Sequence, residues 1–177
     1  MNNLMHSNIE AIEQVLDFIQ QLNNAEYQYS AKPYVDSTIG QHLRHVLDIY
    51  TSVLTVAEDN TNNSIDYNIR RRGAALETQR SAGIAELELL RDSLLKRVTK
   101  PLDGVVVVTS ETSVNEYKND TFQSTLAREL CFAASHLTHH LAIMAIIAKL
   151  SGKDVCSSIG TAPSTATFIR DQATAAI

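Results

Sequence analysis

The chain has 177 residues, of which 44% are hydrophobic and 20% charged, as in one globular domain and unlike disordered or fibrous chains. Its net charge of −5 argues against DNA or RNA binding, which depends on cations that neutralise phosphates. The longest apolar run, residues 141–148, is too short to span a membrane, and the first residues lack the basic start of a signal peptide. We therefore expect a cytoplasmic protein with a single domain over residues 1–177.

Helical periodicity marks two segments in the first third of the chain. Apolar residues recur every three or four positions over residues 7–22, and the segment Ser7–Glu10 matches a capping box, which satisfies free backbone donors of a first helical turn. A second helix, capped by Asp36 or Ser37, is predicted to continue to about Glu58.

The remaining elements include one change of period. A third helix is predicted over about residues 74–98, and a fourth from near 122–125 to residue 150. Between them the β-branched run 105–109 predicts a short strand or one arm of a hairpin. The small, polar tail 151–177 is expected to pack on the surface. Four long amphipathic helices indicate an all-α fold, a four-helix bundle.

Five of the six histidines lie on two of these helices. On a helical wheel His140 falls in the apolar face of the fourth helix and His136 on the same side, whereas His139 lies nearer the edge. Two histidines four residues apart have the spacing of the ligands in the HExxH zinc motif. On the second helix His42 flanks the apolar face and His45 lies at its border. A histidine on an apolar face is often only a core residue, but histidines on two helices of one bundle favour a metal site.

Two carboxylates accompany these histidines along the helices. Glu129 lies two turns before His136 on the same side, where it could be a general base or, more simply, a salt-bridge partner. Asp48 follows His45 by three residues and could orient an imidazole.

A cationic run precedes the third helix. Arg70, Arg71 and Arg72 follow Tyr67 in the loop that leads into that helix. Loop arginines are commonly solvent-facing, but guanidinium groups at the mouth of a bundle would also suit an anionic substrate or a carboxylate such as Glu77.

Four strings resemble a known family. STIGQHLRHVLD, DYNIRRRGAALE, STLARELCFAASHLTHHLAIM and GTAPST occur in the order expected for the DinB-like family of metal-dependent enzymes. They cover most of the chain from the second helix onward. This resemblance implies a four-helix bundle with an up-down-down-up course.

The resemblance also implies a divalent metal ion on three histidines, one from the second helix and two from the HxxxH motif of the last. By position these are His45, His136 and His140, with His42 and His139 as alternates. Zinc is the first choice of metal, and nickel, manganese and iron are alternatives. Relatives include thiol transferases that use low-molecular-weight thiols, thiol-dependent isomerases and hydrolases, so the resemblance implies a small-molecule substrate and no nucleic acid.

These features combine into one functional hypothesis. Three protein ligands leave a coordination position open, which is typical of a catalytic site. Glu129 or Asp48 would orient ligands or move protons, and Tyr67, Arg70 and Arg72 would shape the substrate entrance, for hydrolysis or thiol transfer.

The alternative hypothesis is a non-catalytic, metal-binding or stress-related helical bundle. In either case we expect a homodimer, because relatives are often dimers and the second and fourth helices carry further apolar residues that could pack against a partner, namely Ile49, Val56, Ile143 and Ile146.

Overall fold

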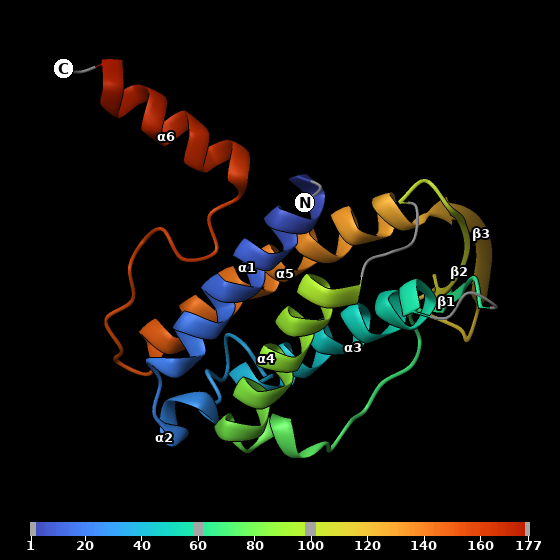
Figure 1. Cartoon of the computed structure of the whole chain (residues 1–177). Helices are drawn as coiled ribbons and strands as arrows, with labels where there is room; N and C mark the ends of the chain where they lie inside the picture. Colours follow the sequence, from blue (N-terminus) through green and yellow to red (C-terminus); the bar gives the residue numbers. More distant parts are fainter. Residues whose placement is uncertain (1–2, 59–61, 98–101, 176–177) are drawn as a thin grey trace.

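The computed structural model describes residues 3–58, 62–97 and 102–175 (Figure 1). Its four long helices are α1 (Asn3–Gln20), α3 (Ile39–Glu58), α4 (Arg80–Arg97) and α5 (Leu126–Leu150). The shorter elements are α2 (Asn24–Tyr27), a 3-10 turn (Ala75–Glu77), α6 (Pro163–Ala175) and the strands β1 (Ser64–Asp66), β2 (Val105–Glu111) and β3 (Asn119–Thr125).

The four long helices pack side by side, with α1 and α3 each in contact with both α4 and α5. The start of α4 lies at the end of α1, since Arg80 donates to the carbonyl of Gln20 (3.2 Å). Lys153, just after α5, donates to the carbonyl of Gln21, just after α1 (2.7 Å). Consequently α1 and α5 run in one direction and α3 and α4 in the other, an up-down-down-up course that the colour gradient of Figure 1 also shows.

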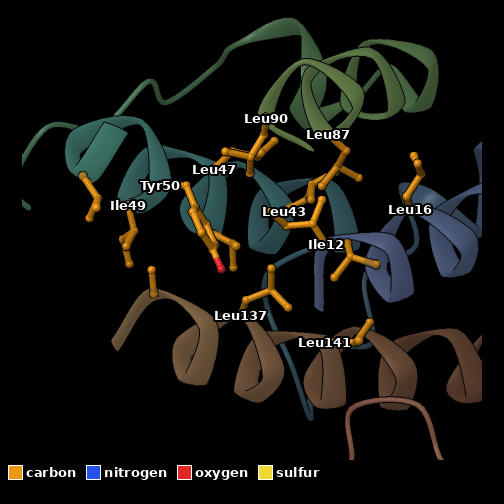
Figure 2. Close-up of a cluster of buried hydrophobic side chains, with 14 of the residues drawn as sticks. Ile12, Leu16, Leu43, Leu47, Ile49, Tyr50, Leu87, Leu90, Leu137 and Leu141 are labelled. Carbon is orange, nitrogen blue, oxygen red and sulfur yellow. The ribbon is translucent and has the colours of Figure 1, made fainter. Parts of the chain in front are cut away.

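The core lies where the apolar faces of these helices meet (Figure 2). One polar pair, Tyr50 and Asn8, is buried among the apolar side chains. The Tyr50 hydroxyl donates a hydrogen bond to Oδ1 of Asn8 (2.8 Å), which satisfies both groups. Each fully buried leucine or isoleucine side chain of the core contributes about 1.5–3 kcal/mol to the free energy of unfolding. Figure 2 labels Ile12, Leu16, Leu43, Leu47, Ile49, Tyr50, Leu87, Leu90, Leu137 and Leu141.

Two helix starts differ from the expected ones. The Ser7 hydroxyl donates to the carbonyl of Asn3 (3.0 Å), so Ser7 lies inside α1 and the predicted capping box is wrong. The helix begins earlier because Met5 is buried in the core. In α3 a capping box does form, but at Thr38, whose Oγ1 accepts from the Gln41 amide while Oε1 of Gln41 accepts from the Thr38 amide.

The third long helix begins later than predicted. The segment before it forms the 3-10 turn, which is held by the hydroxyl of Tyr27 donating to the carbonyl of Leu76 (2.5 Å). This long-range contact replaces the continuous helix that periodicity predicts over residues 74–98. The predicted end of that helix falls on residues 98–101, outside the described residues.

The all-α prediction needs correction, because the chain also contains a three-stranded mixed sheet. The expected hairpin is present, with β2 antiparallel to β3 and Val108 opposite Phe122. β1 was missed because a three-residue strand shows no alternation, and it pairs in parallel with β2, placing Ile65 beside Val108. The sheet matters for the site because β1 leads directly into Tyr67 and the arginine loop.

The C-terminal tail divides into two parts. Val155 and Ile159 pack against the core, and Gly160 lies so close to α5 that a Cβ there would be 2.5 Å from Cα of Ala142. In contrast, α6 has no buried residue and stands apart from the bundle in Figure 1. The expectation of a surface-packed tail therefore describes the first part and not α6.

Among the described residues, α5 is the helix that is long and apolar enough to cross a membrane by length and composition alone. Ten of its residues are buried within the bundle, as in a core helix.

Candidate metal centre

The histidines of α3 and α5 face one another at two levels. His42 and His45 are three residues apart, and His136 and His140 are four apart, so each pair spans about 4.5–6 Å along its helix axis. Because the two helices are antiparallel, His45 meets His136 and His42 meets His140. The Nε2 atoms of His45 and His136 are 2.9 Å apart, and so are the Nδ1 atoms of His42 and His140.

Three of these imidazoles could hold one ion. His45, His136 and His140 each offer a nitrogen, and the three atoms lie within 4.8 Å of one another. Nitrogens bound to a tetrahedral zinc ion at about 2.0–2.1 Å are about 3.3 Å apart, so small adjustments would suffice. His42 contacts His140 and does not belong to this group. His139 is exposed, with its ring centroid 5.4 Å from that of His140.

The protonation state of these imidazoles suits a cation. Burial, together with the neighbouring His136, lowers the pKa of His45 to about 4. Burial and the same neighbour lower the pKa of His140 to about 3. Burial also lowers the pKa of His136. All three are therefore neutral at pH 7, and neutral imidazoles suit zinc, nickel and iron.

A cavity of about 360 Å³ adjoins the three-histidine group. Both long helices contribute to its wall, and so do the arginine loop and the 3-10 turn that follows it. The cavity can therefore admit a small molecule next to the imidazoles. Its lining residues are Ser37, Gln41, His42, Arg44, His45, Arg72, Glu77 and His140.

Asp48 lies near the imidazoles but bonds arginines. Its carboxylate, which is 3% exposed, accepts from Nη1 of Arg44 and from Nε of Arg71, both at 2.6 Å. Arg44 also donates to Glu77 (2.6 Å), and Arg71 to Glu86 (2.8 Å). Within the described residues no hydrogen bond joins Asp48 to an imidazole, so what Asp48 does is hold the arginine loop against α3.

Glu129 is completely buried and does not contact the histidines directly. It accepts hydrogen bonds from the hydroxyls of Tyr67 (2.6 Å) and Ser124 (2.5 Å). Burial raises the pKa of Tyr67, and the bond to Glu129 raises it further, so the phenol stays protonated and donates. The Phe132 ring packs against both Tyr67 and His136, with centroids 5.4 and 5.5 Å away. Glu129 thus reaches the histidines only through these rings.

The three arginines of the loop have different surroundings. Arg70 donates through Nη1 to the carbonyls of Tyr67 and Ile69, and its charge contributes to lowering the pKa of His45. Arg72 is exposed and lines the cavity beside the imidazoles. Arg70 and Arg72 also line a second cavity, of about 460 Å³, against β2 and the β2–β3 turn.

Sequence reasoning missed some residues around the site. Arg71 looked like its neighbours in the cationic run, but it is the one that pairs with Asp48. Arg44 gave a weak signal, as a cation four residues before Asp48 on the same helix face. Phe132 gave none, because an aromatic residue on an amphipathic helix is expected in any core.

Together the fold and these side chains define a helical protein with a three-histidine cluster that could hold a metal ion. The DinB superfamily is the family whose model matches, over residues 9–144, and the chain belongs to this superfamily. The chain is also similar to a protein of Rhizopus delemar named FK506-binding protein 5, with 28% identity over 108 residues. That match covers 61% of this chain but spans only 28% of the fungal protein's length. No solved structure gives a significant match.

Proposed function

We propose that this protein is a metal-dependent enzyme that acts on a small molecule by hydrolysis or by thiol transfer. The observation that carries the proposal is the group of three neutral imidazoles, within 4.8 Å of one another, of which His45 and His140 line a cavity. Zinc is the first choice for the ion, with nickel or iron as alternatives, because imidazole nitrogen suits these metals. Manganese is the weakest alternative, because it prefers oxygen ligands.

The ligand set supports catalysis rather than purely structural binding. Three protein ligands leave a position open to the cavity, whereas structural zinc sites are closed by four. An ion bound there would lower the pKa of a bound water or thiol towards neutrality, as hydrolysis or thiol transfer requires. For transfer, the co-substrate would be a low-molecular-weight thiol.

The surrounding charges support an acidic group on the substrate. Asp48 and Glu77 are paired with Arg71 and Arg44, whereas Arg72 lines the same cavity without a carboxylate partner among the described residues. A carboxylate or similar anion in the cavity would therefore meet a free guanidinium group.

In this proposal Glu129 and Asp48 position the substrate loop instead of moving protons at the ion. Glu129 holds the Tyr67 hydroxyl at the beginning of the loop, and Asp48 holds Arg71 further along it. Of the three residues expected to contact substrate, Arg72 lines the cavity, whereas Tyr67 and Arg70 hold the loop through hydrogen bonds within the protein.

The first test measures bound metal in protein purified without a polyhistidine tag, with His45→Ala, His136→Ala and His140→Ala as variants. We expect close to one equivalent in the wild type and loss in each variant, because two neutral ligands hold an ion poorly. His139→Ala is the matched control and should retain the ion, because His139 lies on the same helix but outside the group.

The second step assays the loaded protein on esters and amides and on electrophilic acceptors with small thiols. Turnover that disappears in the three variants supports the enzyme. Bound metal without an exchangeable water would instead favour the non-catalytic bundle. A wild type that binds no metal would contradict the enzyme and leave a bundle whose histidines only pack.

A further inference from the structure

His42 lies beside the three proposed ligands without being one of them. It comes from α3, one turn before His45, and its Nδ1 is 2.9 Å from Nδ1 of His140. We infer that His42 is a positioning residue that accepts a hydrogen bond from Nδ1–H of His140 and so directs Nε2 of His140 towards the ion. This inference rests on the proposed function, because it concerns the same metal site.

The argument begins with the proton on the His42–His140 pair. A neutral imidazole carries one proton for two ring nitrogens, so only one of the two facing Nδ1 atoms can donate. If His42 donates, His140 carries its own proton on Nε2, and that nitrogen has no lone pair for a metal. If His140 donates, its Nε2 is free to bind. Only the second arrangement is compatible with His140 as a ligand, since its Nδ1 is already engaged by His42.

The geometry of His45 and His136 also favours Nε2 as the metal-binding atom of His140. His45 and His136 approach each other through their Nε2 atoms, at 2.9 Å. With Nε2 of His140, the group would present the same nitrogen from each of its three members. Metal-bound histidines commonly donate their second ring N–H to a partner that fixes the ring orientation.

His140 is the ligand for which such a partner exists. Among the described residues no hydrogen bond is found from Nδ1 of His45 or His136 to a protein atom, whereas His140 has one to His42. The remaining Nε2 of His42 is buried and has no hydrogen-bond partner in the described part of the chain. When His42 accepts at Nδ1, its own proton sits on this Nε2 without a protein acceptor among the described residues. The direction of the bond therefore follows from the ligand role of His140 and not from the surroundings of His42.

The test compares the zinc affinity of three variants by competition with a fluorescent chelator. His42→Ala removes the acceptor and should weaken zinc binding about 10–100-fold, the usual cost of losing such a partner. His42→Asn places an amide oxygen near the position of Nδ1 and should restore affinity to within about threefold of the wild type, because the acceptor is kept. His139→Ala is the control and should bind zinc as the wild type does.

Two further measurements separate positioning from direct ligation. X-ray absorption of the zinc-loaded wild type and His42→Ala should show three imidazoles in both, since His42 is not a ligand. In ¹⁵N spectra of the zinc-loaded wild type, His140 should carry its proton on Nδ1 and the ion on Nε2.

The inference is overturned if His42→Ala binds zinc as tightly as the wild type, if that variant loses one imidazole, or if zinc sits on Nδ1 of His140. The first of these results, with zinc still bound by the wild type, leaves the proposed function intact, whereas a wild type that binds no zinc removes both. If circular dichroism shows that His42→Ala does not fold, the zinc affinity of His42→Asn and the ¹⁵N spectra of wild-type His140 still test the inference.

Discussion

Asp48 shows how one residue can serve the site from a distance. Its buried carboxylate is hydrogen-bonded to Arg44, from its own helix, and to Arg71, from the loop beside the cavity. Burial alone would raise the pKa of Asp48, but the hydrogen bonds and charge of Arg71 and Arg44 outweigh burial and hold the pKa below its usual value of 3.8. Asp48 is thus ionised throughout the neutral range and fixes the loop electrostatically.

The substitution Asp48→Asn should destabilise the protein by about 2 kcal/mol at pH 7, because it leaves the nearly buried guanidinium group of Arg44 and the partly exposed one of Arg71 without their shared anion. Since the folded pKa of Asp48 is depressed, its contribution is complete above 3.8 and is lost as the pH falls through the folded value. Urea unfolding between pH 7 and pH 3 should therefore show the gap between wild type and variant shrinking in acid.

The control for this measurement is Asp92→Asn, which removes a half-exposed partner of Arg91 and Lys96. Its free energy of unfolding should stay within about 0.5 kcal/mol of the wild type. A gap between Asp48→Asn and wild type that persists unchanged at pH 3 would contradict the electrostatic explanation.

At the scale of elements, the 3-10 turn joins α2, α3 and α4 beside the cavity. The Tyr27 hydroxyl, from α2, donates a hydrogen bond to the carbonyl of Leu76 in this turn, and the backbone of Gly40 in α3 lies directly against Glu77. Glu77 in turn binds Arg44. The first turn of α3, which contains His42, is therefore fixed by contacts that only a residue without a side chain at position 40 allows.

Gly40→Ala should destabilise the fold by about 1–3 kcal/mol through overpacking, even though alanine favours helices by about 1 kcal/mol over glycine. The reason is that an added Cβ would lie 2.2 Å from the Glu77 carbonyl oxygen and 2.7 Å from the Tyr27 ring. Chemical denaturation measures the effect. The control Glu88→Ala, at an exposed position of α4, should change the free energy of unfolding by less than about 0.5 kcal/mol. A Gly40→Ala variant at least as stable as the wild type would contradict this prediction and show that the 3-10 turn can move away from α3.

At the scale of the whole molecule, the bundle buries two of the four apolar residues that we expected at a dimer interface. Ile49 and Val56 are 4% and 2% exposed within one chain, so that part of the expectation is wrong, and Ile143 packs against the core. Ile146 is 53% exposed, and Phe168 of α6 is 62% exposed. A homodimer remains a proposal, and these two exposed residues are candidates for its interface.

Ending the chain after Thr161, which removes α6, should leave the thermal midpoint and zinc binding of one chain unchanged, because α6 buries no residue. Ending it after Leu150 is the matched comparison. That truncation also removes Val155 and Ile159 and should lower the midpoint by about 5 °C, since their burial is lost. Calorimetry and light scattering are the measurements. A shorter protein that loses stability or halves its mass on removal of α6 alone would instead place α6 in an assembly.

Local pattern was enough to predict four long helices, a hairpin, and histidines on two facing helices, because helical period and β-branched runs act within a few residues of chain. It was also enough to place His136 and His140 on one face of α5, four residues apart. The family resemblance added His45 as the third ligand, whereas wheel position alone favoured His42, which lies outside the three-histidine group.

Only the tertiary structure decided which groups face one another. The antiparallel packing of α3 and α5 brings His45 to His136 and His42 to His140, and a loop more than twenty residues further along the chain gives Asp48 its second arginine. The short strand β1 exists only because β2 pairs with it. Such partners are set by contacts between segments distant in sequence. Burial then keeps the imidazoles neutral, whereas the paired arginines keep Asp48 charged in spite of its burial.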